Sequence, residues 1–361
     1  MKHSFLLAAV GSLFLASCSS EPSFKLVGTS PVDVPDGGMV YLRNVDGAVL
    51  DSTVLKNHQF VFEGRQDQVV QGWITYKKED KSFRGIVFLE NSEMNLSYEG
   101  GDCKVTGTAT NDLYYDFMNR YKQANEAMRV AYQKYKDEKT SEEERTKLGD
   151  EIHQMNLDCQ KMVAQTITEN IQNPVGVSLV MNFGYQYPET QQKEWILQVP
   201  ESLRPKYMNE MIERFTRMEK TAVGKKFLDF TMQTPEGKDV KLSEFVAKNK
   251  YTLLDFWASW CGPCRADMPN IVKAYQKHHK KGFGIISVSL DNDAKRWTKA
   301  IEDLKMTWDH MSDLKAWDCA GSKMYGVGGI PATVLIANDG TIIARDLHGK
   351  ELDEKLEELL K

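Results

Sequence analysis

Cys261 and Cys264 are the residues of this chain whose type and spacing best suit redox chemistry. They lie in the segment Trp260-Cys261-Gly262-Pro263-Cys264, between a predicted strand and a predicted helix. The first turn of a helix offers free N–H groups and a partial positive charge, which favour a thiolate at Cys261 over a thiol. We therefore expect Cys261 to attack a disulfide. Cys264, one turn further on, can then attack the mixed disulfide and release the reduced partner.

Asp255 is a second candidate, because it interrupts an apolar run from Leu253 to Trp257 in a predicted buried strand. A buried carboxylate is costly unless it is paired or protonated, so we expect the pKa of Asp255 to be raised. Such a group can exchange a proton near neutral pH beside the cysteine pair. The alternative is an aspartate that local hydrogen bonds satisfy and that takes no part in chemistry.

Asp267 lies three residues after Cys264, so the two side chains occupy neighbouring helix surface. Asp267 can tune the resolving thiol, or it can be a solvated acid that only complements the helix dipole. The residues leave both interpretations open. Pro269, inside the same predicted helix, is expected to kink it.

Pro331 follows Gly328-Gly329-Ile330 and precedes a predicted strand. A cis bond between Ile330 and Pro331 would present the backbone of Ile330 to an extended partner peptide. Most X–Pro bonds are trans, so the residues by themselves favour the trans form.

The elements that must position these residues lie in the segment 222–361, where predicted strands alternate with predicted helices. This alternation is typical of a mixed α/β sheet. Ser243 is a candidate helix cap, and Asn338-Asp339-Gly340 predicts a hairpin turn before a last helix with Leu352 and Leu356 on its apolar face. The expected strands cover 227–232, 252–257, 285–290, 332–337 and 341–344.

The preceding part of the chain divides into a β-rich segment, 24–108, and a helical segment, 109–221. Short β-rich runs punctuated by turn residues predict a small antiparallel sheet or sandwich. Apolar residues at helical spacing then predict two amphipathic helices, which form an antiparallel hairpin or, as the less favoured alternative, a dimerising coiled coil. The second helix can open with a capping box of Thr140 with Glu143 or of Ser141 with Glu144.

The first residues have the pattern of a secretory signal, with Lys2 and His3 before an apolar run over 5–16. That run is too short for a membrane-spanning helix, which needs roughly 20 residues. Leu15-Ala16-Ser17-Cys18 resembles the bacterial lipobox, so we expect cleavage after residue 17 and a lipid on Cys18, with 18–23 as a tether. An ordinary signal peptide that happens to contain a cysteine is the alternative.

The net charge gives no reason to expect a nucleic-acid partner, and the remaining cysteines and histidines have simple structural interpretations. Charged residues make up 27% of the 361 residues and the formal net charge is -5, so nothing favours nucleic acid as a partner. Cys103 and Cys159 are expected to be buried core thiols, and Cys319 is either a third redox cysteine or, as we favour, an inert thiol. No metal site is expected, since the two histidines after Cys264 are adjacent rather than spaced for zinc.

Several motifs together resemble thioredoxins and, more closely, the TlpA/ResA-like thiol–disulfide reductases that are tethered outside the cytoplasm. The resemblance covers 222–361 and implies an α/β thioredoxin fold, preceded here by the small β-rich domain and the helical region. A front half with a lipobox, a β domain of unknown function and a helical spacer is similar to that of many Gram-negative lipoproteins. The matching segments are Val223-Gly224-Lys225, 254–265, Asp267-Met268-Pro269 and Gly329-Ile330-Pro331-Ala332-Thr333.

The resemblance assigns a role to each matching position. It implies that Cys261 is the attacking thiol, that Cys264 is the resolving thiol and that Asp255 is the buried acid. Pro331 matches the cis-proline that faces the cysteines, which favours the cis form after all. Asp267 stands where the ResA-like branch usually has a glutamate, and 293–305 resembles the extra helix of that branch.

The expected function is a thiol–disulfide reductase without a cofactor, lipid-anchored in the cell envelope and facing the periplasm. Its partners would be disulfide-containing proteins and a membrane-embedded thiol donor, with Trp260, Gly262, Pro263 and Ile330 contacting the substrate. A thiol peroxidase is one rival, although Ala258 stands where such enzymes usually have a threonine. A non-catalytic binding lipoprotein is the other.

Overall fold

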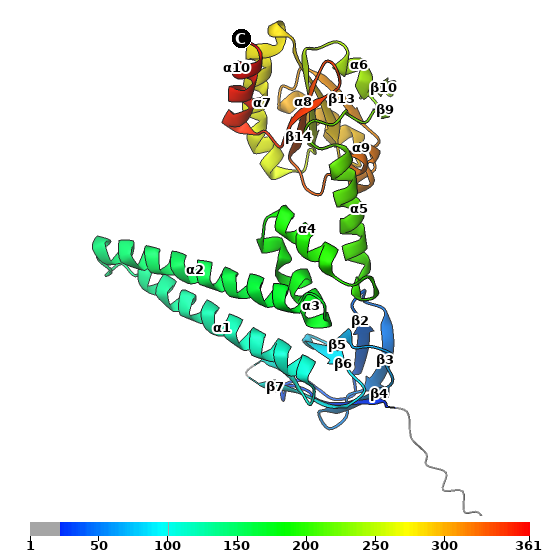
Figure 1. The fold of residues 1–361 in the computed structure, drawn as a ribbon, viewed down its shortest axis with the longest axis vertical. Helices are drawn as coiled ribbons and strands as arrows, with labels where there is room; N and C mark the ends of the chain where they lie inside the picture. The colour runs from blue at the N-terminus through cyan, green and yellow to red at the C-terminus, as the bar shows by residue number, and fades with distance from the viewer. Residues whose placement is uncertain (1–21, 100) are drawn as a thin grey trace, which may run out of the picture. The chain divides into compact units, whose positions relative to one another are not determined.

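The computed structural model describes residues 22–99 and 101–361, which divide into a unit ending at Pro205 and a unit beginning at Lys206. Cys18 and its lipobox lie outside the described residues. Within the described part of the chain, no helix is both long and apolar enough to cross a bilayer. Figure 1 shows the ribbon coloured along the chain, with many of its helices and strands labelled.

The N-terminal unit begins with two four-stranded sheets, ordered β4-β1-β7-β8 and β3-β2-β5-β6. Their inner faces share one apolar core that includes Leu26, Leu42 and Ile74. Neighbouring strands pair antiparallel, with one exception: β1 and β7 run parallel, which differs from the purely antiparallel sheet expected. The strands are β1 (Phe24–Thr29), β2 (Met39–Asn44), β3 (Val49–Val54), β4 (Gln59–Gly64), β5 (Val70–Lys78), β6 (Lys81–Leu89), β7 (Glu93–Glu99) and β8 (Asp102–Thr106).

Two long helices, α1 (Ala109–Lys136) and α2 (Glu142–Asn170), follow the strands and lie side by side. Ser141 caps α2, because its hydroxyl accepts a hydrogen bond from the backbone N–H of Glu144 at 3.3 Å. This contact makes Ser141, rather than Thr140, the N-cap of α2. Shorter helical pieces complete the unit: α3 (Pro174–Phe183), η1 (Gly184–Gln186), α4 (Glu189–Gln198) and η2 (Glu201–Leu203).

The compact C-terminal unit begins at Lys206, so it includes α5 (Lys206–Lys220) together with the segment 222–361. The end of this helix is tied into the unit by Arg345, whose guanidinium donates to the carbonyl oxygen and the hydroxyl of Thr221. Thr221 itself is fully buried. These long-range contacts decide the boundary, and the local helical pattern could not.

One seven-stranded sheet, ordered β10-β9-β13-β12-β11-β14-β15, is the centre of the C-terminal unit. Its inner strand β11 pairs parallel with β12 and antiparallel with β14. The strands are β9 (Thr231–Gln233), β10 (Asp239–Lys241), β11 (Tyr251–Trp257), β12 (Phe283–Ser289), β13 (Asp309–Ser312), β14 (Ala332–Ala337) and β15 (Ile342–Arg345). The helical elements are α6 (Leu242–Val246), α7 (Gly262–His278), η3 (His279–Lys281), α8 (Ala294–Asp303), η4 (Ala316–Asp318), α9 (Ala320–Met324) and α10 (Gly349–Leu359).

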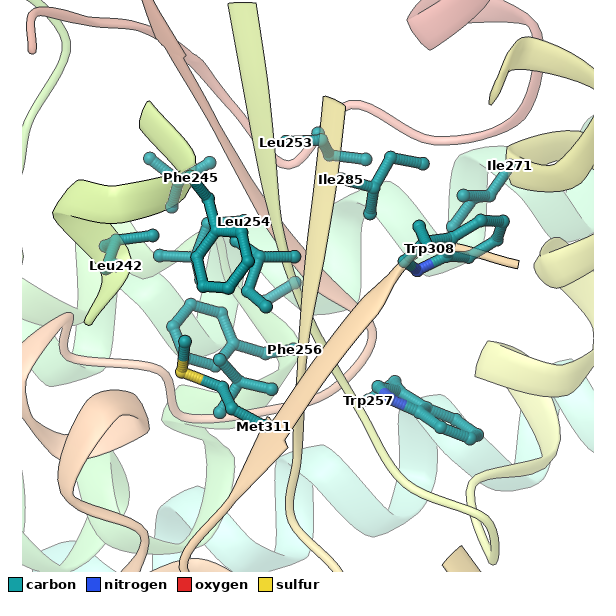
Figure 2. Close-up of a cluster of buried hydrophobic side chains, with 14 of the residues drawn as sticks. Leu242, Phe245, Leu253, Leu254, Phe256, Trp257, Ile271, Ile285, Trp308 and Met311 are labelled. Atoms are coloured by element: carbon teal, nitrogen blue, oxygen red, sulfur yellow. The ribbon is translucent and has the colours of Figure 1, made fainter. Parts of the chain in front are cut away.

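Apolar side chains fill both faces of this sheet, as Figure 2 shows. Because side chains alternate along a strand, Leu254 and Phe256 of β11 point to one face, while Leu253 and Trp257 point to the other. Ile271 of α7 packs on the second face. Asp255 belongs by this alternation to the face that α7 covers.

Two local predictions in this unit were wrong. The first strand begins at Thr231 instead of 227, since the backbone N–H and carbonyl of Leu228 both bond the hydroxyl of Tyr325 rather than a neighbouring strand. Ser243 lies inside α6 and does not cap it. Its hydroxyl instead donates to the carboxylate of Asp229 at 2.8 Å.

Candidate active site

The two reactive cysteines lie where the loop after β11 turns into α7. Cys261 is the N-cap of α7, and its sulfur accepts a hydrogen bond from the backbone N–H of Cys264 at 3.1 Å. Pro263 is tolerated in this first turn because its missing N–H would have had no partner inside the helix. Cys261 and Cys264 are joined in a disulfide, and both are almost completely buried. The structure therefore shows the oxidised form of the pair.

Ile330 and Pro331 reach the disulfide from the segment that precedes β14. The bond between them is cis, as the family resemblance implied. The carbonyl oxygen of Ile330 lies 3.6 Å from the sulfur of Cys261. The surface at the two neighbouring glycines is open, since a Cβ atom added at Gly262 or Gly329 would meet no atom within 4 Å. An extended chain can thus approach both the sulfur and the Ile330 backbone.

Asp255 lies in the middle of β11, and its side chain is 1% exposed. Burial raises its pKa to about 7, and the nearby charge of Asp267 acts in the same direction. One carboxylate oxygen accepts a hydrogen bond from the hydroxyl of Ser287 at 2.7 Å, which opposes the rise. Ser287 in turn accepts from the indole N–H of Trp308 at 2.9 Å. The second oxygen of Asp255 has no partner, so local hydrogen bonds do not satisfy this group.

Asp267 is not a solvated acid, because its side chain is only 14% exposed. One oxygen accepts from the side-chain amide of Asn270 at 2.9 Å and from the backbone N–H of Gly349 at 3.1 Å. The other oxygen lies 3.4 Å from Nδ1 of His348. Asp267 thus ties α7 to the start of α10, and it acts on the site through its charge near Asp255.

Asp291 is a residue of the site that the sequence analysis missed. It is 1% exposed, and its carboxylate accepts from the backbone N–H of Ser259 at 2.9 Å and from the Ser259 hydroxyl at 2.5 Å. The hydroxyl of Ser289 donates to the same carboxylate at 2.7 Å. Asp291 therefore fixes the loop that leads to Cys261. The alternation of serines with apolar residues just before Asp291 was the available signal.

The other described cysteines are poor nucleophiles. Cys319 is fully buried in the C-terminal unit, and burial raises the pKa of its thiol. Burial also raises the thiol pKa of Cys159 in α2, and it raises that of Cys103 in β8 to about 12. A thiol that stays protonated at neutral pH reacts slowly, in contrast to one at a helix N-terminus.

A mixed sheet whose inner strand β11 leads to a cysteine pair at a helix N-terminus, opposite a cis-proline, defines a thioredoxin-fold oxidoreductase. The family model Redoxin matches residues 222–360. A domain of unknown function, DUF4369, matches residues 24–114.

Individual relatives agree with the family model. The chain is 36% identical over 149 residues to the thiol–disulfide oxidoreductase ResA of Bacillus thuringiensis, covering 41% of this chain and 82% of that protein. It is 35% identical to ResA of Bacillus cereus over the same shares. A crystal structure of the thioredoxin domain of a thiol–disulfide oxidoreductase from Bacteroides vulgatus is 33% identical, with a TM-score of 0.36, over 39% of this chain and 99% of that one. The chain belongs to the TlpA/ResA-like thiol–disulfide oxidoreductases.

Proposed function

We propose that this oxidoreductase is a lipid-anchored, extracytoplasmic reductase of disulfides in periplasmic proteins. The observation that carries the proposal is the Cys261–Cys264 pair at the N-terminus of α7, with the Ile330 carbonyl 3.6 Å from the outer sulfur. This arrangement gives one sulfur a stabilised thiolate and leaves room for a polypeptide beside it.

The exchange proceeds in two displacements that conserve atoms and electrons. The Cys261 thiolate attacks one sulfur of the substrate disulfide, forms a mixed disulfide and expels the other substrate sulfur as a thiolate, which takes up a proton. Cys264 then loses its proton and attacks the sulfur of Cys261. The substrate leaves with two thiols, and the enzyme keeps the disulfide that the structure contains.

We assign to Asp255 the role of accepting the proton that the Cys264 thiol loses. By strand alternation it shares the face of Leu253 and Trp257, which α7 covers, and a carboxyl group with a pKa of about 7 can take and return a proton at neutral pH. Its second oxygen has no hydrogen-bond partner and is free to accept that proton.

The sequence of the first residues supports the proposed location, and that location in turn calls for an electron donor. The lipobox at Leu15–Cys18 supports an anchor on Cys18 after removal of residues 1–17. Thiols outside the cytoplasm become oxidised unless a donor restores them. We therefore assign regeneration of the Cys261–Cys264 dithiol to a membrane-embedded protein that carries its own reactive thiols, which passes two electrons and two protons to the pair.

A trapping experiment tests this function directly. A Cys264→Ala variant, expressed in cells, should hold substrates as mixed disulfides on Cys261, because the second displacement cannot occur. The matched control is the Cys261→Ala, Cys264→Ala double variant, which should hold none. The reductase function fails if the single variant captures nothing and the purified full chain cannot reduce insulin.

The anchor has its own test. Cells fed radiolabelled palmitate should label the chain, and a Cys18→Ala variant should lose both the label and its place in the membrane fraction. A chain that stays unlabelled contradicts the lipid on Cys18 and leaves the redox function intact.

A further inference from the structure

Two tryptophan side chains stand exposed next to the reactive disulfide. Trp260 directly precedes Cys261 and is 50% exposed, while Trp317 in η4 is 46% exposed. Their ring centroids lie 6.2 Å apart with the ring planes tilted by 56°. Large aromatic residues normally bury most of their surface, so two half-exposed indoles in contact indicate a binding surface.

The loop that carries Trp317 is held in an unusual conformation. Leu314 and Ala316 both adopt left-handed backbone angles, with φ of 56° and 50°. Residues with a side chain adopt this region at a cost, and it persists only where surrounding contacts impose it. Here Asp313 imposes it, because its carboxylate accepts the backbone N–H groups of Lys315 at 3.2 Å and Ala320 at 2.9 Å.

The end of β12 anchors both tryptophans. The carbonyl oxygen of Ser289 accepts the hydroxyl of Ser312, which in turn accepts the backbone N–H of Leu314 in the Trp317 loop. The hydroxyl of Ser289 bonds Asp291, which holds the loop before Trp260. The two loops that carry the tryptophans are therefore tied to the same strand, which lowers the cost of bringing both indoles to one substrate.

We propose that Trp317 is a specificity-determining residue for the reductase, and that it forms with Trp260 a clamp for a large apolar side chain next to the substrate's disulfide cysteine. This inference rests on the proposed function and names its substrate class, an extended polypeptide segment. Continuity with the reactive site supports that occupant: the segment's cysteine reaches Cys261, and its backbone lies along Ile330.

A small disulfide would make little use of this clamp. It needs to reach only the sulfur of Cys261, next to the open surface at Gly262 and Gly329, and has no side chain for the indoles to contact. Indole rings contribute most when they bury apolar surface of a partner, which is why tryptophan is enriched among the residues that dominate binding. The clamp therefore makes the enzyme prefer polypeptide disulfides in which a large apolar residue flanks the cysteine.

Kinetics with matched substrates test the proposal. The full-length chain and its Trp317→Ala variant are assayed on two disulfide peptides, one with phenylalanine and one with serine beside the cysteine, and on hydroxyethyl disulfide. For the variant we expect about a tenfold loss of kcat/KM on the phenylalanine peptide, mostly through KM, and less than about a twofold change on the other two. Trp317→Phe should restore most of the loss.

A second control removes an exposed aromatic side chain elsewhere in the same unit. Tyr207 in α5 is 53% exposed, and Tyr207→Ala should change none of the three rates. The reduction potential of the Cys261–Cys264 pair should be the same in Trp317→Ala as in the unaltered chain. Equal losses on all three substrates, or a shifted potential, would mean that Trp317 only supports the loop structure and would overturn the proposal.

A binding measurement separates this inference from the redox function. Calorimetry with cysteine-free versions of the peptides, in which serine replaces each cysteine, needs no electron transfer. We expect the oxidised chain to bind the phenylalanine peptide about tenfold more tightly than the serine peptide, and Trp317→Ala to abolish that difference. Equal affinities in the unaltered chain would overturn the clamp, even if every disulfide is reduced. Failure to reduce any disulfide, with the preference intact, would overturn the reductase function alone.

Discussion

Two deeply buried polar side chains, one in each unit, differ in how completely they are hydrogen-bonded. In the N-terminal unit, Asn111 of α1 is 2% exposed, and its amide accepts from the backbone N–H of Phe88 at 2.9 Å and donates to the Phe88 carbonyl at 2.8 Å. In the C-terminal unit, Asp255 is as deeply buried but keeps one oxygen without a partner. Saturated hydrogen bonds make Asn111 a structural joint, whereas the incomplete set at Asp255 leaves a group that can still change its protonation.

The cysteines repeat the same contrast. Cys103 lies in β8 with a thiol pKa that burial raises to about 12. Cys261 is also buried, but its sulfur receives a backbone N–H at the start of α7. Burial alone therefore does not decide reactivity in this chain. What distinguishes Cys261 is its position at the N-terminus of α7, joined to Cys264.

The largest expected effect comes from removing the attacking sulfur. Cys261→Ser should lower the rate of disulfide reduction at least about 1000-fold, because a hydroxyl is a far weaker nucleophile than a thiolate. Cys103→Ala, the counterpart in the N-terminal unit, should leave the rate unchanged. An insulin-reduction assay checks both, and a comparable loss in Cys103→Ala would break the contrast between the units.

Asp255 should make the stability of the C-terminal unit depend on pH. Its pKa is raised in the folded state to about 7, against about 3.9 in an unfolded chain, so the unfolded state releases its proton first as pH rises. The stability is fully present below about pH 4, falls as pH rises, and levels off above about pH 7. The total loss is about 4 kcal/mol.

Asp255→Asn should remove this loss. Relative to the unaltered chain, the free energy of unfolding of the variant should therefore rise by about 4 kcal/mol between pH 4 and pH 8. Hydrogen exchange of the β11 amides, followed by mass spectrometry, measures the difference within this unit. Asp51→Asn in β3, which changes an exposed aspartate, is the control and should show no such gain. A constant difference across the pH range would mean that Asp255 is ionised throughout.

Asn111 should affect stability without affecting activity. Asn111→Ala leaves the N–H and the carbonyl of Phe88 buried without partners, which costs about 2 kcal/mol. Hydrogen exchange of β6 and α1 should become faster by a corresponding factor, while disulfide reduction stays the same. Asn119→Ala, on the same helix, is the control. A fall in the reduction rate would show that this joint serves the redox site.

Ser287 should give the smallest effect. Its hydrogen bond lowers the pKa of Asp255, so Ser287→Ala should raise that pKa further. The rate of disulfide reduction rises with pH because it needs the ionised carboxylate of Asp255. The midpoint of that rise should shift to higher pH by about 1 unit. Ser322→Ala removes a buried serine that bonds the Cys319 carbonyl instead, and it should leave the profile in place.

Local chemistry in the sequence was enough to find the core of the site. The pattern around Cys261 predicts a helix that begins at the cysteine, and an acid inside an apolar run predicts a raised pKa at Asp255. The structure has both features. The cis bond before Pro331 was expected only through the family resemblance, because nothing local favours it.

Contacts between segments far apart in the chain could not be predicted from local sequence patterns. The parallel pairing of β1 with β7 joins strands separated by more than sixty residues, and no local pattern encodes it. The assignment of α5 to the C-terminal unit likewise depends on Arg345, far along the chain. The neighbourhood of Trp260 and Trp317 depends on how two loops leave the same sheet, so Trp317 carried no signal of its own.

The reactivity of one sulfur tests the central claim most directly. In a reduced Cys264→Ala variant at pH 7, the rate at which iodoacetamide alkylates Cys261 can be measured by mass spectrometry. A cysteine peptide in the same solution supplies the reference rate. The start of α7 should stabilise the thiolate, so we expect Cys261 to react at least about tenfold faster than the peptide. A rate equal to or below that of the peptide would contradict the account.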